Sequence, residues 1–145
     1  MPYPEHRRAV VGAWGSGPFE NDDALDWVAS LVGSSGEATL VEAFAQVALR
    51  DDQYLEAPDA SVAVAAAEVV ATARGAPGAG LPSAVDEWIT SHKNEVTVPT
   101  AELARSAMER VASNSELAEV WEESDSSSEW RATIESLQQR LADVA

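Results

Sequence analysis

The sequence predicts an all-α protein, a single irregular bundle of about six to seven short helices around a central Ala/Val-rich helix. Apolar residues recur at intervals of three and four along most of the chain, which is the period of an amphipathic helix. The window from Ala60 to Ala73 holds seven alanines and four valines. A helix that is apolar on nearly all sides is expected at the centre of the bundle.

The first helix is expected to begin at Asn21 or Asp22, because asparagine is a favourable N-cap and carboxylates stabilise the positive end of a helix dipole. We expect Leu25, Val28 and Val32 to form its buried stripe. A second helix is predicted over about 36–50, and its apolar positions are Leu40, Phe44 and Val47.

The central helix is predicted over about 59–74 and is expected to stop at Gly75, before a connecting loop over 76–80. A short helix follows over about 83–92, where Ser83 and Asp86 have the spacing of a capping box.

Three more helices complete the prediction. The first of them follows Pro99–Thr100, and the second begins after a break at 113–115. The last is expected to open with a capping box at Ser126 and Glu129. Their predicted buried positions are Leu103, Ala107, Met108 and Val111, then Leu117, Val120 and Trp121, and finally Trp130, Ile134, Leu137 and Leu141.

The length of 145 residues suits one domain, predicted over 12–145, with 1–11 as a flexible tail or a misassigned start. The 25 acidic residues against 9 Lys and Arg give a net charge of −16, which disfavours binding to nucleic acid or to an anionic membrane. The chain has no cysteine and no long apolar run. We therefore expect a cytoplasmic protein without cofactor or metal.

Four carboxylates crowd within seven residues near the N-terminus: Glu20, Asp22, Asp23 and Asp26. Asp22 and Asp26 would share a helix face, which is a geometry that a hard cation could use. Compensation of the helix dipole explains Asp22 and Asp23 without any ligand. We favour that interpretation and keep the cation site as the alternative.

The Gly-rich segment before this cluster resembles a phosphate-binding loop only superficially, because no lysine follows it. Gly15 and Gly17 are instead expected to let the chain turn sharply, so that the neighbouring aromatic residues pack on the core. Structural roles are therefore predicted for Trp14, Gly15, Gly17, Phe19, Trp27, Trp121 and Trp130, and we expect Trp14 and Trp27 to meet Trp121 or Trp130.

Glu68 is unusual because it is a carboxylate within the most apolar helix. An ion pair or a position at the rim of the core is favoured over catalysis. The candidate partners are Arg50, Arg105 and Arg110.

A second acidic feature is the run from Glu116 to Glu129, which contains no basic residue. Such a run is often just a solvated face, but it could also receive a basic protein by electrostatic steering. The residues that would form this face are Glu116, Glu119, Glu122 and Glu123.

The segment 12–27, GAWGSGPFENDDALDW, resembles the opening string of the bacterial family named domain of unknown function 4259. The resemblance continues through Ala65–Val70, Leu81–Pro82, Trp88 and the segment 114–124, and covers about 12–141. It implies a helical bacterial cytoplasmic protein with no assigned activity, so it transfers no catalytic residues.

Two classes of function follow from these observations. The favoured class is a noncatalytic protein-binding module, in which an acidic helical surface docks a basic partner as an antitoxin-like or immunity-like protein would. The alternative is a metal-dependent hydrolase that uses the Glu20 to Asp26 cluster together with Glu68 or the carboxylates of 119–123.

Overall fold

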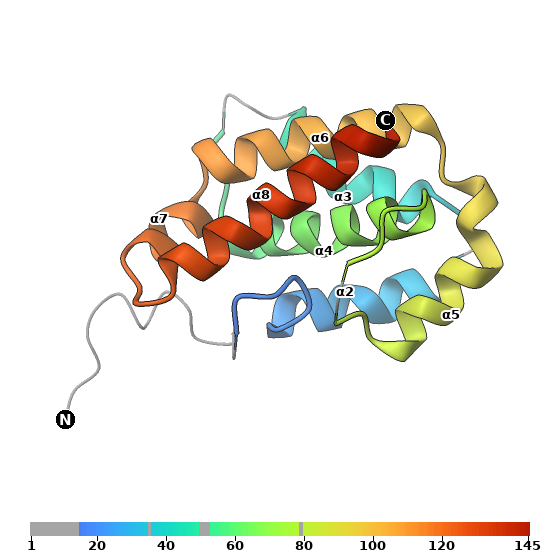
Figure 1. The fold of residues 1–145 in the computed structure, drawn as a ribbon, viewed down its shortest axis with the longest axis horizontal. Coiled ribbons are helices and arrows are strands. Elements are labelled where there is room, and N and C mark those ends of the chain that lie inside the picture. Colours follow the sequence, from blue (N-terminus) through green and yellow to red (C-terminus); the bar gives the residue numbers. More distant parts are fainter. Residues whose placement is uncertain (1–14, 35, 50–52, 79) are drawn as a thin grey trace.

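A computed structural model describes residues 15–34, 36–49, 53–78 and 80–145, and these form a helical bundle (Figure 1). Within the described residues there are seven α-helices and one short 3₁₀-helix, and no strand. The helices are α2 (Asp22–Val32), α3 (Ala38–Ala48), α4 (Ala57–Ala73), α5 (Ser83–His92), η1 (Lys93–Glu95), α6 (Val98–Ser113), α7 (Glu116–Glu122) and α8 (Ser127–Val144). The predicted all-α class is confirmed.

The Ala/Val-rich helix α4 occupies the centre, as predicted, and packs against all six other α-helices (Figure 1). Eleven of its seventeen residues are buried. Its end at Gly75 is also confirmed, because Gly75 has a φ of 106°, a conformation that favours glycine. The N–H of Ala76 donates to the carbonyl of Ala71, and the N–H of Gly75 donates to that of Thr72, which is the pattern of a Schellman motif.

Helix α2 begins as predicted, because the Asn21 side chain accepts a hydrogen bond from the N–H of Ala24 at 2.8 Å. The predicted buried stripe is wrong at two of its three positions. Leu25 is 39% and Val32 47% exposed. The helix instead buries Ala24, Val28 and Leu31. Because α2 packs on both α4 and α5, the face that these two helices cover includes Ala24, Val28 and Leu31 and leaves Leu25 and Val32 toward solvent.

The other predicted stripes largely hold. Helix α3 buries Leu40, Phe44 and Val47, and α8 buries Trp130, Ile134, Leu137 and Leu141. In α7 the predicted positions Leu117, Val120 and Trp121 are all buried. In α6, Ala107, Met108 and Val111 are buried, whereas Leu103 is only partly buried at the edge of the core.

Both predicted capping boxes are wrong. Ser83 is already the first residue of α5, so the N-cap is Pro82, which has no side-chain donor or acceptor. Ser126 is the N-cap of α8, but its side chain makes no capping hydrogen bond. Its N–H donates instead to the hydroxyl of Ser124 at 3.2 Å.

Polar side chains fasten the helix ends to one another. Arg74, at the end of α4, donates to the carbonyls of Val144 and Val96 at 3.0 and 2.9 Å. Glu37 accepts from the N–H of Thr97 at 3.0 Å and from the hydroxyl of Thr100 at 2.8 Å, so it joins the start of α3 to the start of α6. These bonds satisfy backbone groups that helix ends leave without partners.

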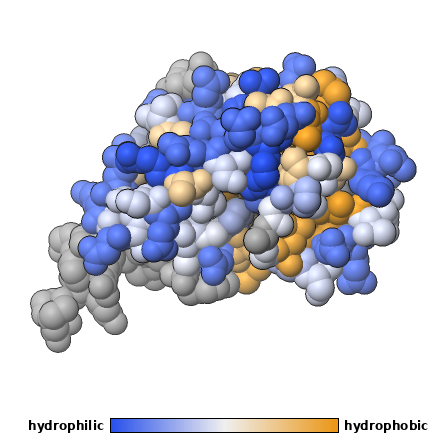
Figure 2. Space-filling model, in the orientation of Figure 1, coloured by the Kyte–Doolittle hydropathy of each residue, from blue (hydrophilic) through white to orange (hydrophobic). Residues whose placement is uncertain are grey.

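The outer surface is mainly hydrophilic over α8, while hydrophobic side chains gather toward α5 and the segment that joins α4 to α5 (Figure 2). Among the described residues, no helix has both the length and the apolar character needed to cross a membrane.

Candidate functional site

The turn formed by residues 15–20 is organised by the side chain of Glu20. The carboxylate accepts a hydrogen bond from the N–H of Gly17 at 2.9 Å. A Cβ atom at Gly15 would lie 2.6 Å from Glu20 Oε1, and one at Gly17 would lie 2.5 Å from it. Phe19 is buried in the core beside this turn. Glycine at 15 and 17 therefore leaves room for the carboxylate to cap its own turn.

The carboxylates of the candidate cluster at residues 20–26, for which a cation site was the alternative interpretation, do not converge. Glu20 is turned back onto Gly17, while Asp22 and Asp23 lie in the first turn of α2, and both are exposed. Asp26 is also exposed, one turn further along. Across the described part of the chain, no three His, Cys, Asp or Glu side chains are grouped so that they could hold a metal ion. Asp22 and Asp23 lie at the N-terminus of α2, where their negative charges interact favourably with the positive end of the helix dipole.

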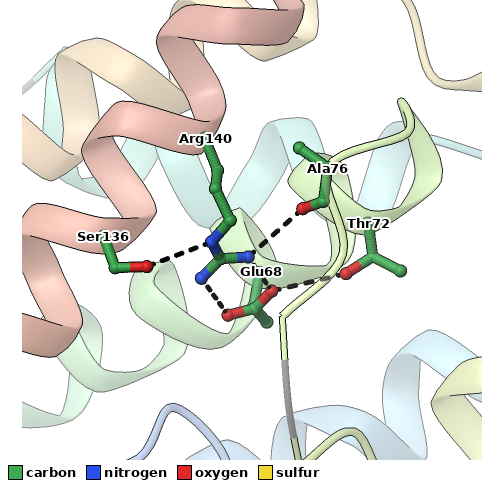
Figure 3. A network of polar contacts seen from close by, with 5 residues as sticks. All are labelled: Glu68, Thr72, Ala76, Ser136 and Arg140. Carbon is green, nitrogen blue, oxygen red and sulfur yellow. Dashed lines mark hydrogen bonds and ion pairs between the residues drawn. The ribbon is translucent and has the colours of Figure 1, made fainter.

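Glu68 forms an ion pair with Arg140 of α8 (Figure 3). The two groups meet in the parallel, bidentate arrangement that guanidinium and carboxylate favour, with Arg140 Nη1 2.5 Å from Oε2 and Nη2 2.8 Å from Oε1. The Thr72 hydroxyl donates to Oε2 at 3.3 Å. Arg140 also donates to the carbonyl of Ala76 and to the hydroxyl of Ser136, both at 3.3 Å.

The predicted ion pair is confirmed, but its partner, Arg140, was not among the three candidates. Arg110 donates elsewhere, to the carbonyls of Val47 and Gln53, and Arg105 is exposed on α6. Arg50 lies outside the described residues. In the sequence Arg140 lies directly beside Leu141 of the apolar stripe of α8, but Arg131 lies in the same way beside Trp130, so this position alone does not single out Arg140.

Burial differs between the two partners. Glu68 is only 2% exposed, whereas the Arg140 side chain is 19% exposed. The hydrogen bonds and the negative charge of Glu68 raise the pKa of Arg140, against the opposing effect of desolvation. The charges neutralise each other within the core, where an unpaired carboxylate would be costly.

Two segments from different parts of the chain lie near the ion pair, one at Gly78 and the other at Gly17 and Pro18. A Cβ atom at Gly78 would lie 2.6 Å from Glu68 Oε2 and 2.8 Å from Arg140 Nη1, so the absence of a side chain lets this segment pass close to the pair. A pocket of about 350 Å³ also borders the pair, and its lining includes Gly17, Pro18 and Ser136. With its oxygens already accepting hydrogen bonds from two side chains, Glu68 is placed to hold α8 against α4.

The acidic run of α7 is partly engaged within the protein. Glu116 accepts from the N–H of Ala57, the first residue of α4, at 2.7 Å. Glu119 accepts from the hydroxyl of Tyr54 at 3.0 Å. The exposed Glu122 pairs with Arg131 at 3.2 Å, and Glu123 is exposed at the end of α7.

The four described tryptophans lie on four different helices, α2, α5, α7 and α8. Trp121 and Trp130 are buried in α7 and α8, whereas Trp27 is half-buried on α2. Among the described residues, the aromatic stacking pair is Trp88 with His92, so the predicted meeting of Trp27 with Trp121 or Trp130 is not found. Trp14 lies outside the described residues.

Residues 12–133 match the model of the family described as Domain of unknown function (DUF4259). The chain belongs to this family. The matched range includes the turn at 15–20, Glu68 and the whole of α7, and it ends within α8 before Arg140. No curated protein and no solved structure matches the chain. The resemblance of the opening string to this family is thus confirmed, and the family description assigns no activity.

Proposed function

We propose that this DUF4259 protein is a noncatalytic protein-binding module that docks a basic protein through the exposed carboxylates of α7, in an antitoxin-like or immunity-like role. The observation that carries the proposal is the exposure of Glu119 and Glu122 on one short helix and of Glu123 at its C-cap. The run from Glu116 to Glu129 contains no basic residue, and the net charge of the chain is −16. Such a surface attracts a basic partner and accelerates its association.

Tyr54 supports the same proposal. The residue is 60% exposed, and its hydroxyl donates to Glu119. Tyrosine offers a large contact area with little loss of side-chain entropy, and it is enriched in protein interfaces. An exposed aromatic ring beside carboxylates is suited to contact the arginine or lysine side chains of a basic protein.

The experiment begins with a photo-crosslinking amino acid in place of Glu123, which identifies the protein that contacts α7 in cells. The purified pair is then titrated by calorimetry, and the titration is repeated with a charge-reversed triple variant, Glu119→Lys with Glu122→Lys and Glu123→Lys. The control carries the same change in net charge on exposed positions of α6 and α8, namely Glu102→Lys with Glu109→Lys and Glu135→Lys.

We expect the α7 variant to weaken the complex by at least about tenfold and the control to weaken it much less, because close charges act more strongly than distant, screened ones. Added salt should weaken the wild-type complex. Equal losses in the two variants, or the absence of any basic protein among the crosslinked products, would contradict the proposal.

A further inference from the structure

We infer that the groove between α2 and α3 binds an arginine side chain of a protein partner, with Trp27 as its aromatic wall and Glu42 as its counter-charge. This inference rests on the proposed function, since it assumes a basic protein as partner. It names a second contact surface, separate from α7, and the chemical group that this surface recognises.

The groove exists because α2 and α3 both pack on α4 but hardly touch each other. The space left between them measures about 270 Å³. Its apolar lining comes from Trp27 of α2, Ala43 of α3 and Val62 of α4, and its rim carries Glu42 and Gln46 of α3. Three helices therefore build one groove with an apolar lining and a polar edge.

Trp27 is the largest side chain in this lining. It is only half-buried, although α2 buries Ala24, Val28 and Leu31 against the core. A half-exposed indole in a groove presents its ring to an incoming group, and a guanidinium stacks on such a ring through cation–π attraction. The methylene groups of an arginine would cover the apolar surface of Ala43 and Val62.

The charges around the groove select a cation. Glu42 is exposed at its rim. Asp23 is exposed four residues before Trp27, so it lies on the same face of α2 one turn away. None of the described residues that line the groove is basic. Carboxylates on both helices thus favour a cationic side chain, and the planar guanidinium suits both the ring and a carboxylate.

The test uses the whole protein and two small probes, N-acetyl-arginine amide and N-acetyl-citrulline amide. Citrulline has nearly the shape of arginine but no charge. Two-dimensional NMR follows the indole N–H signals, and the signal of Trp27 is assigned by its loss in Trp27→Phe. We expect the arginine probe to shift the Trp27 signal saturably, and the citrulline probe to shift it far less.

Two matched variants sharpen the test. Glu42→Gln should weaken arginine binding about two- to fivefold, as expected for the loss of one exposed charge contact. Glu135→Gln removes an equal charge from α8 and should leave the binding unchanged. Both residues are exposed, so neither change is expected to disturb folding.

Three results would overturn the inference: equal shifts with arginine and citrulline, shifts at all five tryptophans alike, or equal losses in Glu42→Gln and Glu135→Gln. A shift that depends on protein concentration would indicate a second copy of the chain in the groove instead. Because the probe needs no partner protein, failure here is distinguishable from failure of the α7 titration, and each outcome can occur without the other.

Discussion

The protein handles its carboxylates differently in two regions. Between α4 and α8, Glu68 is nearly inaccessible and is matched by the full positive charge of Arg140. Around the start of α7, Glu116 and Glu119 lie nearer to water, and their described hydrogen-bond donors are neutral: the N–H of Ala57 and the hydroxyl of Tyr54. The two regions separate charge that stabilises the core from charge that is available at the surface.

The difference follows from desolvation. A carboxylate removed from water loses hydration that only a cation and several hydrogen bonds can replace. A carboxylate at the surface keeps much of its hydration, so a single neutral donor suffices to orient it. The remaining attraction of a surface carboxylate is then available to a partner. This contrast is why we assign Glu68 to stability and propose a binding role for the exposed carboxylates Glu119, Glu122 and Glu123.

The largest expected effect is that of Arg140→Leu, which leaves Glu68 buried without a cation. We expect a loss of about 3 kcal/mol in the free energy of unfolding at neutral pH, at the low end for a broken buried pair because Arg140 is 19% exposed. Urea unfolding measures this loss. The double variant Glu68→Leu with Arg140→Leu should recover most of it, since apolar residues often replace a buried pair at little cost.

If the single variant loses less than about 1 kcal/mol, or if the double variant is no more stable than the single one, the assignment of Glu68 to the stability of the core fails.

An intermediate effect is expected for Glu116→Gln. Glutamine can still accept a hydrogen bond from the N–H of Ala57, but it lacks the charge that favours the positive end of α4. The expected loss in the free energy of unfolding is about 0.5–1 kcal/mol. Glu123→Gln, the matched control on the same helix, should change it by less than about 0.5 kcal/mol. Equal effects of the two changes would show that Glu116 is surface charge like its neighbours.

The smallest effect on stability concerns Tyr54. Desolvation of its hydroxyl, the hydrogen bond to Glu119 and the charges of Glu119, Glu116 and Glu56 raise its pKa from 10.0 to about 12. The stabilisation linked to this hydroxyl is therefore present below pH 10 and is lost as the pH rises through about 12.

Tyrosinate absorbance, measured as the difference between the wild type and Tyr54→Phe, reports this pKa. Glu119→Gln should move it toward 10, because the hydrogen-bonded negative charge is gone. If the pKa of Tyr54 in the wild type is near 10, Glu119 is not the hydrogen-bond partner of its hydroxyl.

The regular spacing of apolar residues over long segments was enough to predict the helices and most of their buried faces. In α8 the intervals of four, three and four fix one buried stripe. In α4 polar residues are so few that the helix is apolar on nearly all sides, which places it at the centre of the bundle. The prediction failed in α2, where Leu25 and Val32 are as apolar as Val28 but lie exposed. The hydrophobicity of the residues alone does not determine which face of a helix its neighbours cover.

For the site, the sequence indicated that Glu68 needs a partner and that the carboxylates of residues 22–23 suit a helix start, because both conclusions depend on local chemistry. It could not select Arg140 from among the arginines, since Glu68 and Arg140 are separated by 72 positions and meet only when α8 crosses α4. The groove at Trp27 was equally inaccessible to sequence reasoning. It depends on the packing of α2 and α3 on a third helix, and the distance between two helices is set by the shapes that the tertiary structure brings together.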